Sequence, residues 1–150
     1  MLIKLVAIVA AFILAEPWLP RPTAERYARD VYAVTQQCEA ALMLVATADG
    51  ESNLRRSVET CRTRGRRGEL GLYQLLPDYL NDATARRICR DNRLATRLAH
   101  SRLVWLRGDR GSAEAALVGY IGKSKRAERL ARGRVELYAK LRREVTCGDD

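Results

Sequence analysis

The chain has 150 residues, of which 47% are hydrophobic and 30% are charged, and these proportions exclude an intrinsically disordered protein. Its length suits one domain with room for a substantial core. The 27 lysines and arginines outnumber the 18 aspartates and glutamates, which gives a net charge of +9. This excess favours polyanionic partners such as nucleic acid, anionic lipid or an anionic wall polymer, and it does not choose among them.

The N-terminal segment has the pattern of an export signal. Lys4 is the only charged residue before Glu16, and an unbroken apolar run follows it. This run is shorter than the roughly 20 residues of a membrane-spanning helix, so residues 1–15 are predicted to be a secretory signal peptide. Ile13 departs from the small residue typical of a cleavage site, which leaves an uncleaved membrane anchor as the alternative. We therefore expect a protein that is secreted, periplasmic or membrane-tethered.

The four cysteines fit an oxidising compartment. They are widely spaced, and neither a CxxC pair nor a histidine-rich run accompanies them, so no zinc site is expected. Of the three possible pairings into two disulfides we favour Cys61 with Cys89 and Cys38 with Cys147, with free buried thiols as the alternative. No metal or organic cofactor is predicted.

The first half of the mature chain is predicted to contain one long helix and one loop. Three prolines predict an extended linker over residues 16–22, because proline disfavours helix. Thr23 is a predicted N-cap, and apolar residues then recur at steps of four and three until Asp49-Gly50 ends or bends the helix. Residues 53–70 lack this period and form a predicted basic loop with room for a small hairpin. Its arginines are Arg55, Arg56, Arg62, Arg64, Arg66 and Arg67.

The second half is predicted to be almost entirely helical. The expected helices are 82–106, with a break near Asp91 and Asn92, then 113–121 after a Ser112 cap, and 124–145. The fold class is therefore α+β and predominantly α-helical, with a small irregular or β segment between helices. We expect one domain over residues 23–150.

Three ordered motifs indicate the chemistry. Glu51-Ser52 ends the first long helix, residues 68–77 have the sequence GELGLYQLLP, and residues 115–120 have the sequence AALVGY. A carboxylate at a helix end, beside a glycine-rich turn that a ligand can approach closely, suits a general acid for cleaving a glycosidic bond. In this order the motifs resemble those of the lytic transglycosylase and goose-type lysozyme superfamily, over roughly residues 38–140.

The resemblance implies a lysozyme-like fold that cleaves the β-1,4 bond between N-acetylmuramic acid and N-acetylglucosamine in peptidoglycan. Glu51 matches the catalytic acid of this superfamily. Gly71, Tyr73 and Gln74 match positions that line the sugar-binding cleft, and Tyr120 matches the tyrosine of the third motif. For both tyrosines, simple packing in the core is an equal alternative.

A general acid must hold its proton near neutral pH, and burial of Glu51 beside apolar residues would raise its pKa. Asp49 and Glu69 are the nearby candidates for a second carboxylate. If neither points inward, the acetamido group of the substrate must assist, and in this superfamily such a reaction ends in a 1,6-anhydro sugar. Ser52 is interpreted as a local hydrogen-bonding residue, and His100 as a structural or surface residue.

Other functions stay open. Tyr120 is followed by Ile121-Gly122, where the superfamily has an asparagine and a small residue before glycine, and this favours a catalytically inactive, peptidoglycan-binding or structural protein as the alternative. A phage-type lysin that keeps its N-terminal helix in the membrane until release would share the chemistry.

The basic segments have two interpretations each. The loop over residues 53–70 is either a solubilising surface or a contact to an anionic wall polymer or lipid. Nucleic acid is the rival partner suggested by the last helix, but the export signal and the sparse aromatic residues argue against it. We expect a monomer. Arg134 also shares a face with Tyr138 and Leu141 that is apolar but for the stem of this arginine. The basic residues of the last helix are Lys123, Lys125, Arg126, Arg129, Arg132 and Arg134, expected on a solvated face.

Overall fold

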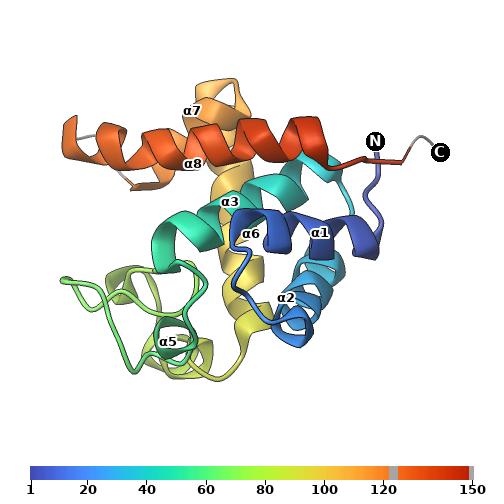
Figure 1. Cartoon of the computed structure of the whole chain (residues 1–150). Coiled ribbons are helices and arrows are strands. Elements are labelled where there is room, and N and C mark those ends of the chain that lie inside the picture. Colours follow the sequence, from blue (N-terminus) through green and yellow to red (C-terminus); the bar gives the residue numbers. More distant parts are fainter. Residues whose placement is uncertain (122–124, 149–150) are drawn as a thin grey trace.

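The computed structural model of the chain describes residues 1–121 and 125–148, and this part is predominantly α-helical (Figure 1). It contains only isolated β-bridges and no strand, so the segment between helices is irregular and forms no hairpin. The predicted helix-rich class is confirmed. The helices are α1 (Leu5–Ala15), α2 (Arg21–Val34), α3 (Cys38–Ser52), α4 (Arg56–Glu59), α5 (Asp82–Ile88), α6 (Asn92–Arg110), α7 (Ala113–Ile121) and α8 (Lys125–Glu144), with a 3-10 turn η1 (Pro77–Tyr79).

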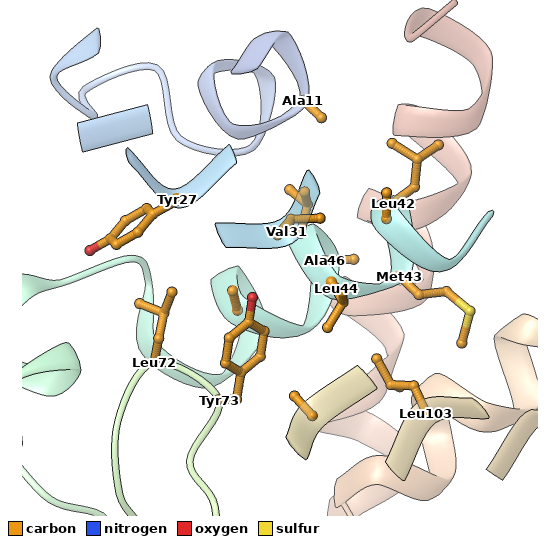
Figure 2. Close-up of a cluster of buried hydrophobic side chains, with 14 of the residues drawn as sticks. Ala11, Tyr27, Val31, Leu42, Met43, Leu44, Ala46, Leu72, Tyr73 and Leu103 are labelled. Atoms are coloured by element: carbon orange, nitrogen blue, oxygen red, sulfur yellow. The ribbon is translucent and has the colours of Figure 1, made fainter. Parts of the chain in front are cut away.

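The central helix is α3, which is apolar around most of its circumference. Every residue from Ala41 to Ala48 is buried. A helix that is apolar on all sides must be enclosed by other elements, and α1, α2, α6, α7 and α8 all pack against α3. Figure 2 shows Leu42, Met43 and Leu44 leaving α3 in different directions into this core. The middle of α3 is therefore enclosed from several sides, and its last turn continues from this enclosed part.

The single helix predicted from residue 23 to residue 49 is wrong, because the chain breaks at residues 35–37. There the backbone N–H of Ile3 donates to the carbonyl of Gln36 at 2.8 Å, which requires extended backbone. This long-range contact overrides an apolar period that continues across the break. The second helix, α3, then runs on past the expected stop, so that Glu51 lies in its last turn.

The predicted linker over residues 16–22 is shorter than expected. Helix α2 begins at Arg21, with Pro22 in its first turn, where the missing N–H of proline costs no hydrogen bond. Pro20 rather than Thr23 precedes the helix as its N-cap. The break predicted near Asp91 is present between α5 and α6.

Helix α1 packs inside the fold. Ile8, Ala11 and Phe12 are fully buried, and the helix lies against α2 and α3. The ring of Phe12 stands 5.6 Å from the ring of Tyr27, measured between centroids. The residues predicted as a signal peptide or anchor thus contribute to the core of this structure. Within residues 1–121 and 125–148, no helix combines the length and the apolarity that a membrane crossing requires.

The favoured disulfide pairing is confirmed. Cys38 pairs with Cys147 across a Cα–Cα distance of 6.0 Å, and Cys61 pairs with Cys89 across 5.3 Å. The first bond joins the start of α3 to the C-terminal segment, near the N-terminus (Figure 1). The second ties the basic loop to the end of α5, and it therefore limits the motion of the segment that follows Glu51.

Candidate active site

Glu51 occupies the last turn of α3, and its side chain is 18% exposed. Beyond it, Asn53 and Leu54 have φ values of 48° and 51°, a left-handed conformation that non-glycine residues rarely adopt twice in succession. The Ser52 hydroxyl donates to the carbonyl of Ala48 and accepts from the N–H of Leu54 at 3.1 Å. Ser52 thus stabilises the abrupt exit from the helix that leaves Glu51 at its end.

A buried guanidinium contacts the Glu51 carboxylate. Arg134 of α8 places its Nη2 atom 3.0 Å from Oε1 of Glu51, and its side chain is only 1% exposed. The expected solvated position of Arg134 is wrong, because α8 turns this residue toward α3 together with Tyr138 and Leu141. The spacing of these three residues is the sequence signal for that burial. The side chains of Lys123, Lys125 and Arg126 lie outside the described residues.

The surroundings of Glu51 favour its protonated form. Burial raises the pKa of Glu51, because the charged carboxylate loses hydration. The positive charges of Arg134 and, at longer range, Arg102 oppose this rise, while the negative charge of Glu69 adds to it. The pKa of Glu51 is raised on balance, which is the direction that a general acid requires.

The two other predicted carboxylates are engaged with different partners. Asp49 faces Glu16, the residue that follows α1, and the two carboxyl groups share a hydrogen bond. The Oε2 atom of Glu69 accepts from the backbone N–H of Arg67 at 2.8 Å, within its own loop. Of the two, only Glu69 has a charge that raises the pKa of Glu51.

A third carboxylate, which lies outside the three sequence motifs, anchors the loop after Glu51. Glu59 of α4 is buried and makes a two-pronged ion pair with Arg26 of α2, with Nη2 and Oε2 2.9 Å apart. The Tyr27 hydroxyl also donates to Glu59 at 3.0 Å. Bidentate pairs of this kind fix orientation as well as position, so Glu59 holds the loop against α2.

The glycine-rich motif forms a tight turn. Leu70 and Leu75 exchange two backbone hydrogen bonds of 2.9 Å each. Gly71 has a φ of 69°, and a Cβ at this position would stand 2.9 Å from a methyl carbon of Ile88. Gln74, with a φ of 47°, donates from Nε2 to the carbonyl of Gly71 at 2.9 Å. In this structure the predicted cleft residues Gly71 and Gln74 therefore shape the turn itself.

A Gly71→Ala variant is expected to unfold more easily, by about 1–3 kcal/mol, because alanine is strained at positive φ and its methyl group meets Ile88. Gly108 is the matched control, since it lies in α6 and nothing surrounds its Cβ position within 4 Å. Gly108→Ala is expected to leave stability unchanged or to raise it by up to about 1 kcal/mol. Denaturant titration measures both, and equal effects would contradict the conformational role of Gly71.

Tyr73 and Tyr120 pack in the core, and Tyr120 also binds the backbone of Tyr73. Both side chains are buried, at 0% and 3% exposure, and burial raises the pKa of each. The Tyr120 hydroxyl donates to the carbonyl of Tyr73 at 3.0 Å, which ties α7 to the glycine-rich turn. Arg102 covers the ring of Tyr120 at 4.5 Å and donates to its carbonyl at 2.7 Å. The structure therefore favours packing over open sugar contact for these two tyrosines.

The stability of the protein is expected to depend on Asp49. Burial, followed by the contact with Glu16, raises the pKa of Asp49 from 3.8 to about 7. Between these values the folded state binds more protons than the unfolded state, so the free energy of unfolding falls as pH rises from 4 to 7. Because Asp49 is only partly buried, this loss is on the order of 1 kcal/mol. Denaturation at several pH values should show it in the wild type and not in Asp49→Asn.

His100 lies away from Glu51. It lines a cavity of about 880 Å³ near the first turns of α3, together with Cys38, Leu42 and Met43, whereas Glu51 is in the last turn. Burial lowers the pKa of His100, so the imidazole is neutral at pH 7. The expected structural or surface position of His100 agrees with this placement.

Known proteins provide no direct guide to this site. No protein family, curated protein or solved structure matches the chain. In the part of the chain that the structure describes, no three histidine, cysteine or acidic residues gather in an arrangement that could hold a metal ion.

Proposed function

We propose that this protein is a lysozyme-like enzyme that cleaves peptidoglycan glycan strands, in the manner of the lytic transglycosylases that its motifs resemble. The observation that supports this proposal is the environment of the Glu51 carboxyl group. This carboxyl group lies at the C-terminal end of the central helix, it is largely buried, its pKa is raised, and the Arg134 guanidinium contacts it. A group so placed holds its proton to higher pH than an ordinary glutamate and can then exist as an anion beside a buried cation.

In the proposed reaction Glu51 acts first as acid and then as base. Its proton passes to the glycosidic oxygen, the bond from this oxygen to C1 of N-acetylmuramic acid breaks, and N-acetylglucosamine leaves as an alcohol. The acetamido oxygen of the muramic acid forms a bond to C1. The C6 hydroxyl then attacks C1, displaces the acetamido oxygen, and returns a proton to Glu51. Between the two steps Arg134 stabilises the Glu51 carboxylate.

The engagement of the other carboxylates supports this route over one with a carboxylate partner. Asp49 is directed to Glu16, and Glu69 accepts a hydrogen bond within its own loop. The two-carboxylate mechanisms require a second carboxylate that is free to act on the sugar or on water. The proposed product is accordingly a 1,6-anhydro sugar.

The basic loop suits a contact to anionic wall polymer or lipid near the site. All six of its arginines are exposed, and the loop leads directly from Glu51 to the glycine-rich turn. Such a contact would weaken as salt is added. The proposed substrate places the protein outside the cytoplasmic membrane, either secreted or periplasmic or tethered, and the two disulfides are consistent with that.

The test is mass spectrometry of soluble fragments after purified peptidoglycan is digested with the full chain, disulfides intact, beside a Glu51→Gln variant. We expect anhydro-muramyl products from the wild type alone. Products with reducing ends would keep Glu51 as the acid and overturn the second step, because water rather than the C6 hydroxyl would then have attacked C1. Equal release by both proteins would overturn the assignment of Glu51.

A second candidate function is peptidoglycan binding without cleavage. It is favoured by the third motif, in which Ile121-Gly122 follows Tyr120 and the expected asparagine is absent. In that case the folded protein would sediment with insoluble peptidoglycan and release no fragments. The same digestion, followed by centrifugation, therefore separates the two candidates.

A further inference from the structure

The guanidinium of Arg134 lies directly over Gly50, the residue between Asp49 and Glu51. A Cβ on Gly50 would stand 2.6 Å from Nε of Arg134 and 3.0 Å from Nη2. Any other residue at this position would displace the guanidinium. Gly50 thus leaves a notch in α3 that places one buried cation beside two carboxyl groups.

Arg134 and Asp49 carry buried polar atoms that lack partners. In the described part of the chain, Nε and Nη1 of Arg134 and Oδ1 of Asp49 have no hydrogen bond, while Nη2 of Arg134 binds Glu51. Unpaired buried polar atoms are rare and costly. Here two donors and one acceptor belong to neighbouring side chains, and the charges of the two side chains interact. Pairing between Arg134 and Asp49 would give both side chains hydrogen bonds that they lack.

The carboxyl of Asp49 has a competing neighbour in Glu16. Two groups face its carboxyl, Glu16 at the end of α1 and Arg134 from α8, and the bond between the two carboxyls exists only while one of them is protonated. Burial and Glu16 raise the pKa of Asp49 to about 7. The groups that face Glu51 are Arg134, Arg102 of α6 and Glu69 of the loop.

We propose that Asp49 is a positioning residue for Arg134, and that loss of its proton draws the guanidinium from Glu51 to Asp49. While Asp49 is protonated, Arg134 stays on Glu51. Once Asp49 is charged, Glu51 shares its cation with a second anion and retains its own proton more strongly. The acid form of Glu51 then persists to higher pH than a fixed ion pair would allow. The consequence for the rate of peptidoglycan cleavage rests on the proposed function. The movement of Arg134 is independent of that function.

The test is a carbon-13 NMR titration of the Glu51 carboxyl in the full chain, from about pH 4 to about pH 9. In the wild type, Glu51 should show a second inflection where Asp49 titrates. In Asp49→Asn this inflection should be lost, while in Glu25→Gln, a substitution of a partly exposed residue paired with Arg21, it should remain. A single inflection that is identical in wild type and Asp49→Asn would overturn the proposal.

Glu16→Gln provides a second variant that leaves Asp49 in place. It removes the charge and the shared hydrogen bond that help to raise the pKa of Asp49, so the second inflection should move to lower pH. An unmoved inflection would overturn the proposal even if Asp49→Asn failed to fold. If the wild type cleaves peptidoglycan, the alkaline limb of the rate profile should move to lower pH in Asp49→Asn. An NMR coupling without any cleavage would instead mean that only the enzymatic proposal fails.

Discussion

A Glu51→Gln variant is expected to release soluble peptidoglycan fragments about 10²–10⁴-fold more slowly than the wild type, the range that a general acid contributes. Glutamine has nearly the same shape, and its amide oxygen can still accept from Arg134, so the contact between α3 and α8 is kept. The variant lacks only the proton that the glycosidic oxygen must receive. The initial rate of fragment release, compared at equal concentrations of folded protein, measures the effect.

Glu69→Gln is the matched control for this prediction. Glu69 lies near enough to raise the pKa of Glu51 by its charge, yet its own carboxylate is bound within its loop. Its removal should leave cleavage intact, lower the pKa of Glu51, and move the alkaline limb of the rate profile to lower pH. Loss of activity in Glu69→Gln equal to that in Glu51→Gln would indicate a two-carboxylate mechanism.

A Phe12→Ala variant is expected to lower the free energy of unfolding by about 3–5 kcal/mol. Phe12 is fully buried where α1 meets α2, and its ring packs on Tyr27. Removing it leaves a cavity in the core that the surrounding helices cannot fill completely. Denaturant unfolding of the full chain, at a pH where both proteins fold, measures the difference.

The control for this second prediction lies on the same helix. Val6 is 69% exposed, so Val6→Ala should change stability by no more than about 0.5 kcal/mol. If Phe12→Ala is as mild as Val6→Ala, α1 does not belong to the folded core in solution, and its interpretation as an export segment gains weight. If Phe12→Ala has the expected effect, the folded domain requires α1, and residues 16–150 alone should be much less stable.

The sequence by itself determined the helix-rich class and the position of Glu51 at the end of an apolar helix. These features follow from local signals. The apolar run of α3 requires enclosure, and Asp91 accepts from the N–H of Leu94 at 3.0 Å as the cap of α6. Such signals extend over one or two helical turns, and so they can be recognised without knowledge of the rest of the chain.

Only the tertiary structure decided the features that depend on residues far apart in the chain. The break between α2 and α3 exists because Ile3 pairs with Gln36, although the apolar period continues through it. Arg134 is buried because Gly50 leaves space for its guanidinium beside Glu51, more than 80 positions earlier. Periodicity assigns a residue to a face of a helix, but the partner of that face is settled by packing. The state of the Glu51 proton therefore depends on contacts that the local sequence around it does not contain.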